Sequence, residues 1–401
     1  MTNRRSILKA ISTLTAATYF ARPVFGQAKL HVGVVGSGIV GVSIALHLAQ
    51  AGAKVTVFEK TALAAGATSK SFAWINGSNT NQNYRNLRIK SLEGWQKLDR
   101  ELGLGIIWGG AIKWQPPGEV AARVRADIMA MAATNYPFKE IDADMFRRVG
   151  SEFTPGDIDI AGLATTGGHL DPVSVTTKLM ARAKLLGVDV KMPCAVEELI
   201  MSGNDLRGVK TTDGDMALDR LVIASGVDTP RLTSKAGYLP NLHHEPGILV
   251  HSTAVEVATN KVVYGPGVHF KQFAYGRIVG ADSETPPKSD THQEIRRHAV
   301  AFPSKEIEDM HSQRIIDKIA RFLPAAQKAQ PHHLTLGFRP MPADRFPILG
   351  YLPKSSTIYV AVMHSGVTLA PIVGRMVTSE LIGDKQEEIL SPFRPDRPGL
   401  L

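Results

Sequence analysis

The chain has 401 residues, of which 44% are hydrophobic and 21% are charged. At ~100 to 200 residues per domain this length predicts two or three domains, and the composition excludes a disordered chain or one that crosses a membrane several times. A single cysteine, Cys194, excludes an internal disulfide, a cysteine-rich zinc site and an iron–sulfur cluster on four cysteines. The net charge of +9 raises the question of nucleic-acid binding.

The first 28 residues differ from the rest of the chain. They hold four basic residues and no acid, so that without them the net charge falls from +9 to +5. Arg4 and Arg5 precede a mildly apolar run over residues 10–20 and small residues at 26 and 28. This order resembles a twin-arginine export signal, with an ordinary basic terminus as the alternative. We therefore expect a periplasmic protein, and we expect no transmembrane span because the run falls short of the ~20 apolar residues required.

A strand, a glycine-rich turn and a helix follow over residues 30–50, and a second strand over 54–58 ends at Glu59. The turn reads Gly-Ser-Gly-Ile-Val-Gly, which is typical of a βαβ unit that places a dinucleotide pyrophosphate on a helix N-terminus. Glu59 lies where a carboxylate can accept both ribose hydroxyls. We expect cofactor contacts from Gly36, Ser37, Gly38, Ile39, Val40, Gly41, Glu59 and Lys60.

The loop over residues 64–76 is rich in small and amide side chains, whereas a nicotinamide-binding domain would continue promptly into further strand–helix units. With this loop the sequence resembles the D-amino-acid oxidase superfamily of FAD-dependent oxidoreductases, which includes glycine oxidase, sarcosine oxidases and D-amino-acid dehydrogenases. The resemblance implies that the loop wraps the flavin, while packing in the core is the alternative for Trp74. The implied contacts are Thr68, Ser69, Ala73 and Trp74.

The middle of the chain resembles the part of the family that returns to the cofactor. A helix predicted over 173–186 begins at an Asp-Pro pair, which suits a helix start, and a strand over 188–192 follows. A later apolar strand, over 221–226, ends in small residues. The resemblance implies FAD contacts from Val196, Ala224 and Gly226.

The C-terminal motifs are the most specific match to the family. They are Gly-Phe-Arg-Pro at 337–340 and Asp-Arg-Phe-Pro-Ile-Leu-Gly at 344–350. A strand over 357–363 then runs into a glycine turn and a helix-like run over 372–382. The resemblance implies that this turn aims the partial positive charge of a helix N-terminus at the flavin. The implied contacts are Ser365, Gly366, Val367, Thr368 and Leu369.

Together these matches imply an α/β fold, in which a Rossmann-like FAD-binding domain is interleaved with an α+β substrate domain built on an antiparallel sheet. We expect the FAD-binding domain to comprise residues 29–85, 155–232 and 333–390, and the substrate domain residues 86–154 and 233–332. The charges of the substrate domain are mixed in sign, and no basic run interleaves with aromatics. This pattern argues against nucleic-acid binding.

The resemblance implies oxidation of an amine or D-amino acid by hydride transfer to flavin N5, followed by hydrolysis of the imine. A carboxylated substrate needs a cation, and guanidinium suits a two-pronged grip. Arg339 stands where glycine and D-amino-acid oxidases hold the substrate carboxylate; a brace for the flavin loop or an ion pair with a structural carboxylate is the alternative. His269 and His364 are the other candidate active-site residues, and either could be a structural histidine.

Two departures from the family limit what the resemblance implies for this chain. No histidine lies in 67–74 and no cysteine lies near the C-terminal motifs, so we expect non-covalent FAD. No arginine lies within 365–370, where glycine oxidase has a second one, which leaves secondary or N-methylated amines open as substrates. The histidine pairs at 243–244 and 332–333 point to opposite faces of a strand, so we expect no metal.

Two other functions stay open at this point. One is an FAD-dependent 2-hydroxy-acid dehydrogenase, which would need a base near the alcohol. The other is a non-catalytic accessory protein that binds a flavin. The sequence predicts a small-molecule substrate, but it does not distinguish oxygen from a quinone as the electron acceptor.

Overall fold

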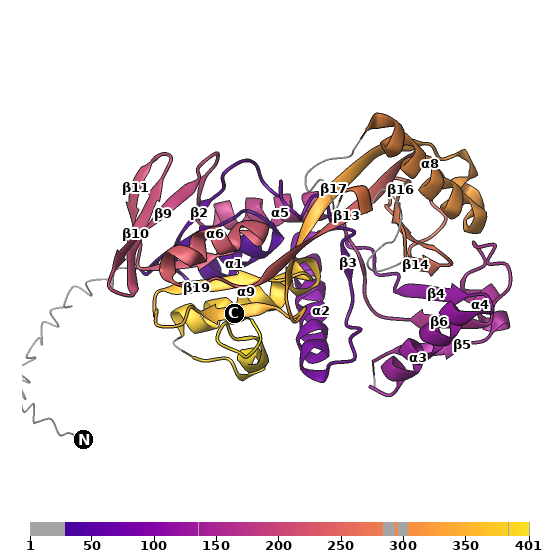
Figure 1. Ribbon diagram of the computed structural model, residues 1–401, viewed down its shortest axis with the longest axis horizontal. Helices are drawn as coiled ribbons and strands as arrows, with labels where there is room; N and C mark the ends of the chain where they lie inside the picture. The colour runs from indigo at the N-terminus through magenta and orange to yellow at the C-terminus, as the bar shows by residue number, and fades with distance from the viewer. Residues whose placement is uncertain (1–28, 135, 284–292, 296–303, 384, 401) are drawn as a thin grey trace, which may run out of the picture.

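The structure is a computed structural model that describes residues 29–134, 136–283, 293–295, 304–383 and 385–400. The expected export signal, residues 1–28, lies outside the described residues. The chain forms two halves, and two long strands, β13 (Leu242–Ala254) and β17 (Pro331–Pro342), run between them (Figure 1).

The first half is built on a six-stranded sheet that is parallel except for its edge strand β18. Strand β1 lies at its centre, between β12 and β2, so segments far apart in the sequence meet here. In spatial order the strands are β18 (Ile348–Tyr351), β19 (Ile358–Val362), β12 (Arg220–Ile223), β1 (His31–Val35), β2 (Lys54–Phe58) and β8 (Asp189–Lys191).

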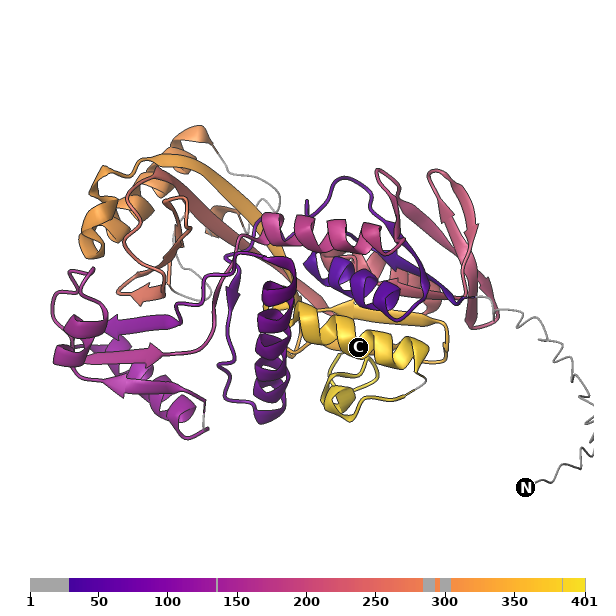
Figure 2. The same cartoon turned by 180° about the vertical axis from the view of Figure 1, so that it is seen from behind.

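Both faces of this sheet are covered, which explains its continuous apolar strands. On one face α1 (Ile39–Gln50) packs between α5 (Pro172–Leu185) and α9 (Gly366–Ile382), and α2 (Gln82–Leu102) packs on α9 (Figure 2). A three-stranded sheet covers the other face; its strands are β11 (Gly214–Ala217), β10 (Asp205–Thr211) and β9 (Val196–Ser202).

The second half is built on an eight-stranded sheet that is antiparallel except for the pair β14–β4. Helices α8 (Lys305–Phe322) and α4 (Ala143–Val149) share a core with it, and α3 (Glu119–Ala132) packs against β4, β5 and β6. Between β13 and the edge, the remaining strands are β16 (Arg277–Ala281), β15 (Val268–Gln272), β14 (Val262–Gly265), β4 (Ala111–Gln115), β6 (Ile160–Ala164) and β5 (Phe138–Ile141).

Short elements complete the fold. Strand β3 (Trp74–Ile75) lies at the end of the loop over residues 64–76, which we call the flavin loop, and pairs with β7 (Gly168–His169). The others are η1 (Gly226–Asp228), α6 (Thr229–Thr233), η2 (Ser234–Ala236), η3 (Pro324–Lys328) and η4 (Glu388–Phe393). Over the described residues, none of the helices combines the length and the apolar character needed to cross a membrane.

The architecture is the predicted fold class, an α/β dinucleotide-type sheet beside a largely antiparallel second sheet. The domain boundaries stay a prediction. Three elements pack with the half of the molecule other than the one to which their segments were assigned. Helix α2, most of which falls in the segment assigned to the substrate domain, packs against α9. Strands β6 and β17, which fall in segments assigned to the FAD-binding domain, lie in the eight-stranded sheet.

Candidate active site

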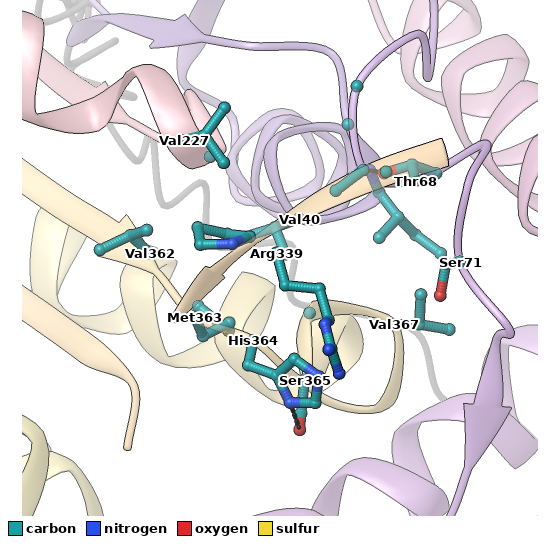
Figure 3. Close-up of a pocket in the computed structure, with 18 of the residues that line it drawn as sticks. Val40, Thr68, Ser71, Val227, Arg339, Val362, Met363, His364, Ser365 and Val367 are labelled. Carbon is teal, nitrogen blue, oxygen red and sulfur yellow. Dashed lines mark hydrogen bonds between the residues drawn. The ribbon is translucent and has the colours of Figure 1, made fainter. Parts of the chain in front are cut away.

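A cavity of about 1030 Å³ is lined by segments of both halves. It follows the turn between β1 and α1, the loop after β2, the ends of β12 and β19, and strands β13 and β17. Most of the predicted site residues line it: Gly36, Gly38, Ile39, Val40, Glu59, Lys60, Thr68, Ala73, Trp74, Val196, Ala224, Gly226, His269, Arg339, His364, Ser365, Gly366, Val367 and Thr368. Figure 3 shows Val40, Thr68, Arg339, His364 and Ser365 around one space.

The first turn of α1 lines the cavity. Gly36 has a φ of +103°, a left-handed conformation that favours glycine, and a Cβ on Gly41 would overlap the carbonyl oxygen of Gly36. The N-cap residue Gly38 brings no side chain to the helix start. The N–H of Ile39 donates to the Thr68 hydroxyl at 3.1 Å, whereas those of Val40 and Gly41 have no partner four residues back in the helix and can meet an anion.

Glu59 lies at the end of β2, beside this helix start. Its carboxylate accepts from the backbone N–H and the hydroxyl of Ser37, both at 2.9 Å, and from the N–H and hydroxyl of Thr61 at 2.9 and 3.0 Å. These donors hold the carboxylate in place on the cavity wall. Because the two hydroxyls can rotate away, the carboxylate can accept ribose hydroxyls instead.

Four predicted contacts do not line the cavity, for local reasons. Ser37 is buried beneath the turn and binds Glu59, and Gly41 provides the close packing of α1 on β1. The Ser69 hydroxyl turns to the carbonyl groups of Ala65 and Gly66. Leu369 faces the core and is 0% exposed. Thr68, in contrast, accepts the Ile39 N–H at 3.1 Å and ties the loop to α1.

The N-terminus of α9 lines the cavity beside the start of α1, because a Cβ on Gly366 would lie 2.9 Å from Cγ2 of Val40. The helix begins at Gly366, six residues before the helix-like run predicted from the sequence, and continues through Pro371. Because Pro371 has no N–H, the carbonyl of Val367 is left for another donor, and the Trp95 indole donates to it at 2.9 Å. Helix α2 thereby holds the first turns of α9 in place.

Arg339 reaches into the same part of the cavity from β17 (Figure 3). Its Nη2 lies 3.5 Å from Oε2 of Glu245, the residue directly opposite on β13, and 3.4 Å from the Pro246 carbonyl. The two side chains are 28% and 26% exposed. The structure thus provides a carboxylate partner for Arg339 and also leaves the guanidinium accessible from the cavity.

His269 belongs to a wall of four aromatic rings on the same cavity. Its ring stacks on Tyr264 at 5.1 Å and meets Phe72 edge-on at 4.7 Å, and Trp74 lies 5.1 Å from Tyr264. We call Phe72, Trp74, Tyr264 and His269 the aromatic wall. Burial lowers the pKa of His269 to about 4 and raises that of Tyr264, so both rings are neutral at pH 7.

His364 lies just before α9, with Nδ1 3.4 Å from the Ser365 hydroxyl (Figure 3). The surrounding protein lowers its pKa, and the charges of Arg339, Arg88 and Arg345 lower it further, although the ring remains accessible from the cavity. Three guanidinium groups therefore lie near one imidazole. This part of the cavity favours an anion over a cation.

Three residues of this site were missed by the sequence reasoning. Tyr264 and Phe72 complete the aromatic wall, and Tyr264 pairs with His269 between strands β14 and β15. Arg88 comes from α2, which no motif connected with the cavity. Within the described residues, no group of three or more His, Cys, Asp or Glu side chains could hold a metal ion.

The arrangement fits FAD. An acidic residue at the end of β2 and the start of α1 provide for a ribose and for phosphates, and α9 brings a second helix start to the same cavity. The cavity is large enough for a dinucleotide, since sites for much smaller ligands occupy ~300 to 1,000 Å³.

Comparison with known proteins agrees with this assignment. The family described as "DAO: FAD dependent oxidoreductase" matches residues 31–380. Glycine oxidase of Bacillus licheniformis is 24% identical over 376 residues, which cover 91% of this chain and 96% of that enzyme. Human mitochondrial dimethylglycine dehydrogenase is 30% identical over 203 residues, but these cover 48% of this chain and only 23% of that longer protein.

Among solved structures, glycine oxidase from Geobacillus kaustophilus superposes with a TM-score of 0.80 at 21% sequence identity. The match covers 92% of this chain and 99% of that one. At this identity the likeness establishes the fold.

Proposed function

Because the chain belongs to the DAO family of FAD-dependent oxidoreductases, we propose that it oxidises the amine-bearing carbon of a substrate that also carries a carboxylate. The observation that carries the proposal is the placement of Arg339 and the aromatic wall on the cofactor cavity. Bound FAD supplies the hydride acceptor, flavin N5, and the oxidised substrate is an imine that water hydrolyses.

Arg339 is proposed to hold the substrate carboxylate. A guanidinium makes short, charge-assisted hydrogen bonds to a carboxylate and can do so through two nitrogens. Its present partner, Glu245, lies 3.5 Å away, and both side chains are about a quarter exposed, so this ion pair is weak. A substrate carboxylate can therefore compete for the guanidinium or share it.

The aromatic wall is proposed to contact the alkyl groups on the substrate amine. Aromatic faces bury methyl groups and also attract a cationic amine. Two of the similar proteins are named for glycine and for dimethylglycine, which are small amines with one carboxylate. These features support a small amino acid, an N-methylated one or another secondary amine as the substrate.

The protonation of the site favours an amine over a 2-hydroxy acid. Removal of an alcohol proton needs a base with a pKa near the working pH, whereas His269 has a pKa of about 4 and that of His364 is also lowered. An amine needs only to arrive as its free base. The cations around His364 assist, because they favour loss of the proton from a bound ammonium group.

The test is anaerobic mixing of the purified flavoprotein with a panel of glycine, sarcosine, dimethylglycine, D-alanine, D-proline and lactate. We expect at least one carboxylated amine to bleach the flavin absorbance and lactate to leave it unchanged. Reduction by lactate alone would contradict the proposal, as would a flavin that dithionite reduces but no amine does. Admission of air then identifies the acceptor, because rapid recovery of the absorbance indicates oxygen and recovery only with a quinone indicates a quinone.

The mode of FAD binding and the location of the protein are part of the proposal. Cys194, the single cysteine, donates its backbone N–H to the Glu59 carbonyl and so lies beside the expected ribose site. We expect non-covalent FAD, which acid precipitation releases into the supernatant; colour in the pellet would contradict this.

For export, exchange of Arg4 and Arg5 for lysine should retain the protein in the cytoplasm, and unchanged periplasmic recovery would exclude the twin-arginine route.

A further inference from the structure

Arg88 is a buried arginine on α2 that the proposed chemistry does not use. Its side chain lines the cavity and is 8% exposed. Nε donates to the Asn76 carbonyl at 3.1 Å, Nη2 to Oδ1 of Asn76 at 2.6 Å, and Nη1 to the Ser365 hydroxyl at 3.3 Å. These bonds use three of the five N–H donors of the guanidinium and leave two.

The charge of Arg88 has no counter-charge nearby. All three of its acceptors are neutral, and no carboxylate within the described residues forms an ion pair with it. Burial of a cation without an anion is unfavourable, because the protein interior solvates the charge less well than water does. An anion bound in the cavity would relieve this cost.

The guanidinium is held rigidly at the start of α9. Arg88, Ser91 and Trp95 lie on one face of α2, at the spacing of successive helical turns. All three contact the first turns of α9: Arg88 donates to Ser365, the Ser91 hydroxyl donates to the Thr368 carbonyl at 2.6 Å, and Trp95 donates to the Val367 carbonyl at 2.9 Å. A fixed charge of this kind acts without reorganising when an anion appears.

The position of Arg88 indicates which anion it meets. Glu59 and the start of α1 would hold the ribose and the phosphates, and the flavin ring of an FAD extended from there along the cavity would reach the start of α9, which lies beside the start of α1. Two-electron reduction with uptake of one proton leaves one negative charge on that ring. Of the other two cations near His364, Arg339 has Glu245 beside it and Arg345 is exposed to solvent.

We propose that Arg88 raises the reduction potential of bound FAD by stabilising the negative charge that the flavin gains on reduction. Because Arg88 donates to the Ser365 hydroxyl at 3.3 Å, the guanidinium and the start of α9 present positive charge at one place on the cavity wall. This inference rests on FAD dependence and holds for any substrate. Arg88 thus adjusts the reduction potential of the cofactor, and Asn76 positions the Arg88 guanidinium.

The test compares flavin reduction potentials, measured by equilibrium with a reference dye during anaerobic reduction with dithionite. In an Arg88→Met variant the equilibrium constant for flavin reduction should be roughly tenfold to a hundredfold lower than in the parent chain, because a buried positive charge near the flavin is lost. For a two-electron couple this corresponds to a fall of ~30 to 60 mV. Arg88→Lys, which keeps the charge, should recover more than half of the difference.

Arg85→Met is the matched control. Arg85 lies one turn earlier on α2, is 7% exposed, does not line the cavity and donates to the carbonyls of Asn79 and Thr80. Its loss should leave the potential unchanged. An unchanged potential in Arg88→Met would overturn the inference, as would an equal fall in Arg85→Met. If Arg88→Met fails to retain FAD, Asn76→Ala decides: a fall in potential supports the inference and an unchanged potential contradicts it.

Discussion

The two helix starts that open into the cavity, those of α1 and α9, differ in the charge around them. The start of α1 has the Glu59 carboxylate beside it, and the cations Lys60 and Arg231 on the cavity wall are both paired with Asp228, at 3.4 and 3.0 Å. The start of α9 has the buried Arg88 and the accessible Arg339. The charged groups near Glu59 are therefore balanced between two acids and two bases, whereas those at the start of α9 are mainly basic.

This difference separates two kinds of anion binding. Phosphates carry their charge permanently, and backbone N–H groups at α1 are sufficient to hold them, so the carboxylate next to them can serve a ribose. At α9 the charges come with the substrate and with reduction of the flavin. Fixed guanidinium groups are suited to such charges because their orientation does not change during the reaction.

The largest expected effect comes from disturbing the packing of α1 on the glycine-rich turn. In a Gly41→Ala variant the new Cβ overlaps the Gly36 carbonyl oxygen, so α1 and the turn must move apart. We expect the free energy of unfolding to fall by about 1 to 3 kcal/mol and the affinity for FAD to fall at least tenfold. Chemical denaturation and equilibrium FAD titration measure the two effects.

Gly66→Ala is the control for this variant. Gly66 also lines the cavity, but a Cβ there meets no atom within 4 Å. Both quantities should stay close to those of the parent chain. Equal losses in the two variants would mean that the packing of α1 on its turn is not what holds the dinucleotide site together.

The second prediction concerns buried bases behind the flavin loop. Burial lowers the pKa of His169 to about 3 and that of Lys271 to about 7; these side chains are 0% and 1% exposed. In each case the unfolded chain binds a proton that the folded chain does not, so stability rises with pH between the folded and the unfolded pKa. We expect the free energy of unfolding to rise from pH 5 to pH 6.5 through His169 and the other histidines whose pKa is lowered, among them His269 and His364, and again from pH 7 to pH 10 through Lys271.

Lys271→Met separates the two contributions. Lys271 donates to the Leu170 carbonyl at 2.8 Å and its Nζ lies 4.4 Å from the Phe273 ring, so methionine keeps most of the packing. The variant should lose the rise above pH 7 and keep the rise below it. A parent chain whose stability is flat between pH 7 and pH 10 would contradict a neutral, buried Lys271.

The smallest expected effect concerns the ion pair between Arg339 and Glu245. Glu245→Gln removes the carboxylate that competes for Arg339 and keeps the size of the side chain. Because partly exposed ion pairs are worth ~0 to 1 kcal/mol, we expect affinity for an unreactive carboxylate such as acetate to rise up to about fivefold. Weaker acetate binding in this variant would mean that Glu245 orients Arg339 for its ligand.

The βαβ opening could be predicted from the sequence because its signals are local. The glycines, the helix start and Glu59 lie within 30 residues, and each has a direct backbone or hydrogen-bonding reason. The individual cofactor contacts within that stretch are harder to predict. Ser37 and Gly41 belong to the glycine-rich motif but do not line the cavity, because residues of one turn alternate between the cavity and the core.

The part of the site at α9 depended on contacts between distant segments. The pattern placed the regular helix after Pro371, yet α9 begins at Gly366 because Trp95, 276 positions earlier than Pro371, satisfies the carbonyl that proline leaves free. Arg88 follows the amphipathic pattern of α2, and only the packing of α2 on α9 brings it to the cavity. Helical periodicity gives the buried face of a helix but does not identify its partner.

The difference between the two helix starts is tested most directly by acetate titrations of the FAD-loaded protein, followed by flavin absorbance, in Glu59→Gln and Arg339→Met variants. We predict that Arg339→Met weakens acetate binding at least tenfold and retains its FAD, while Glu59→Gln, once saturated with FAD, binds acetate like the parent chain. Loss of FAD from Arg339→Met, or weakened acetate binding in Glu59→Gln, would contradict the account.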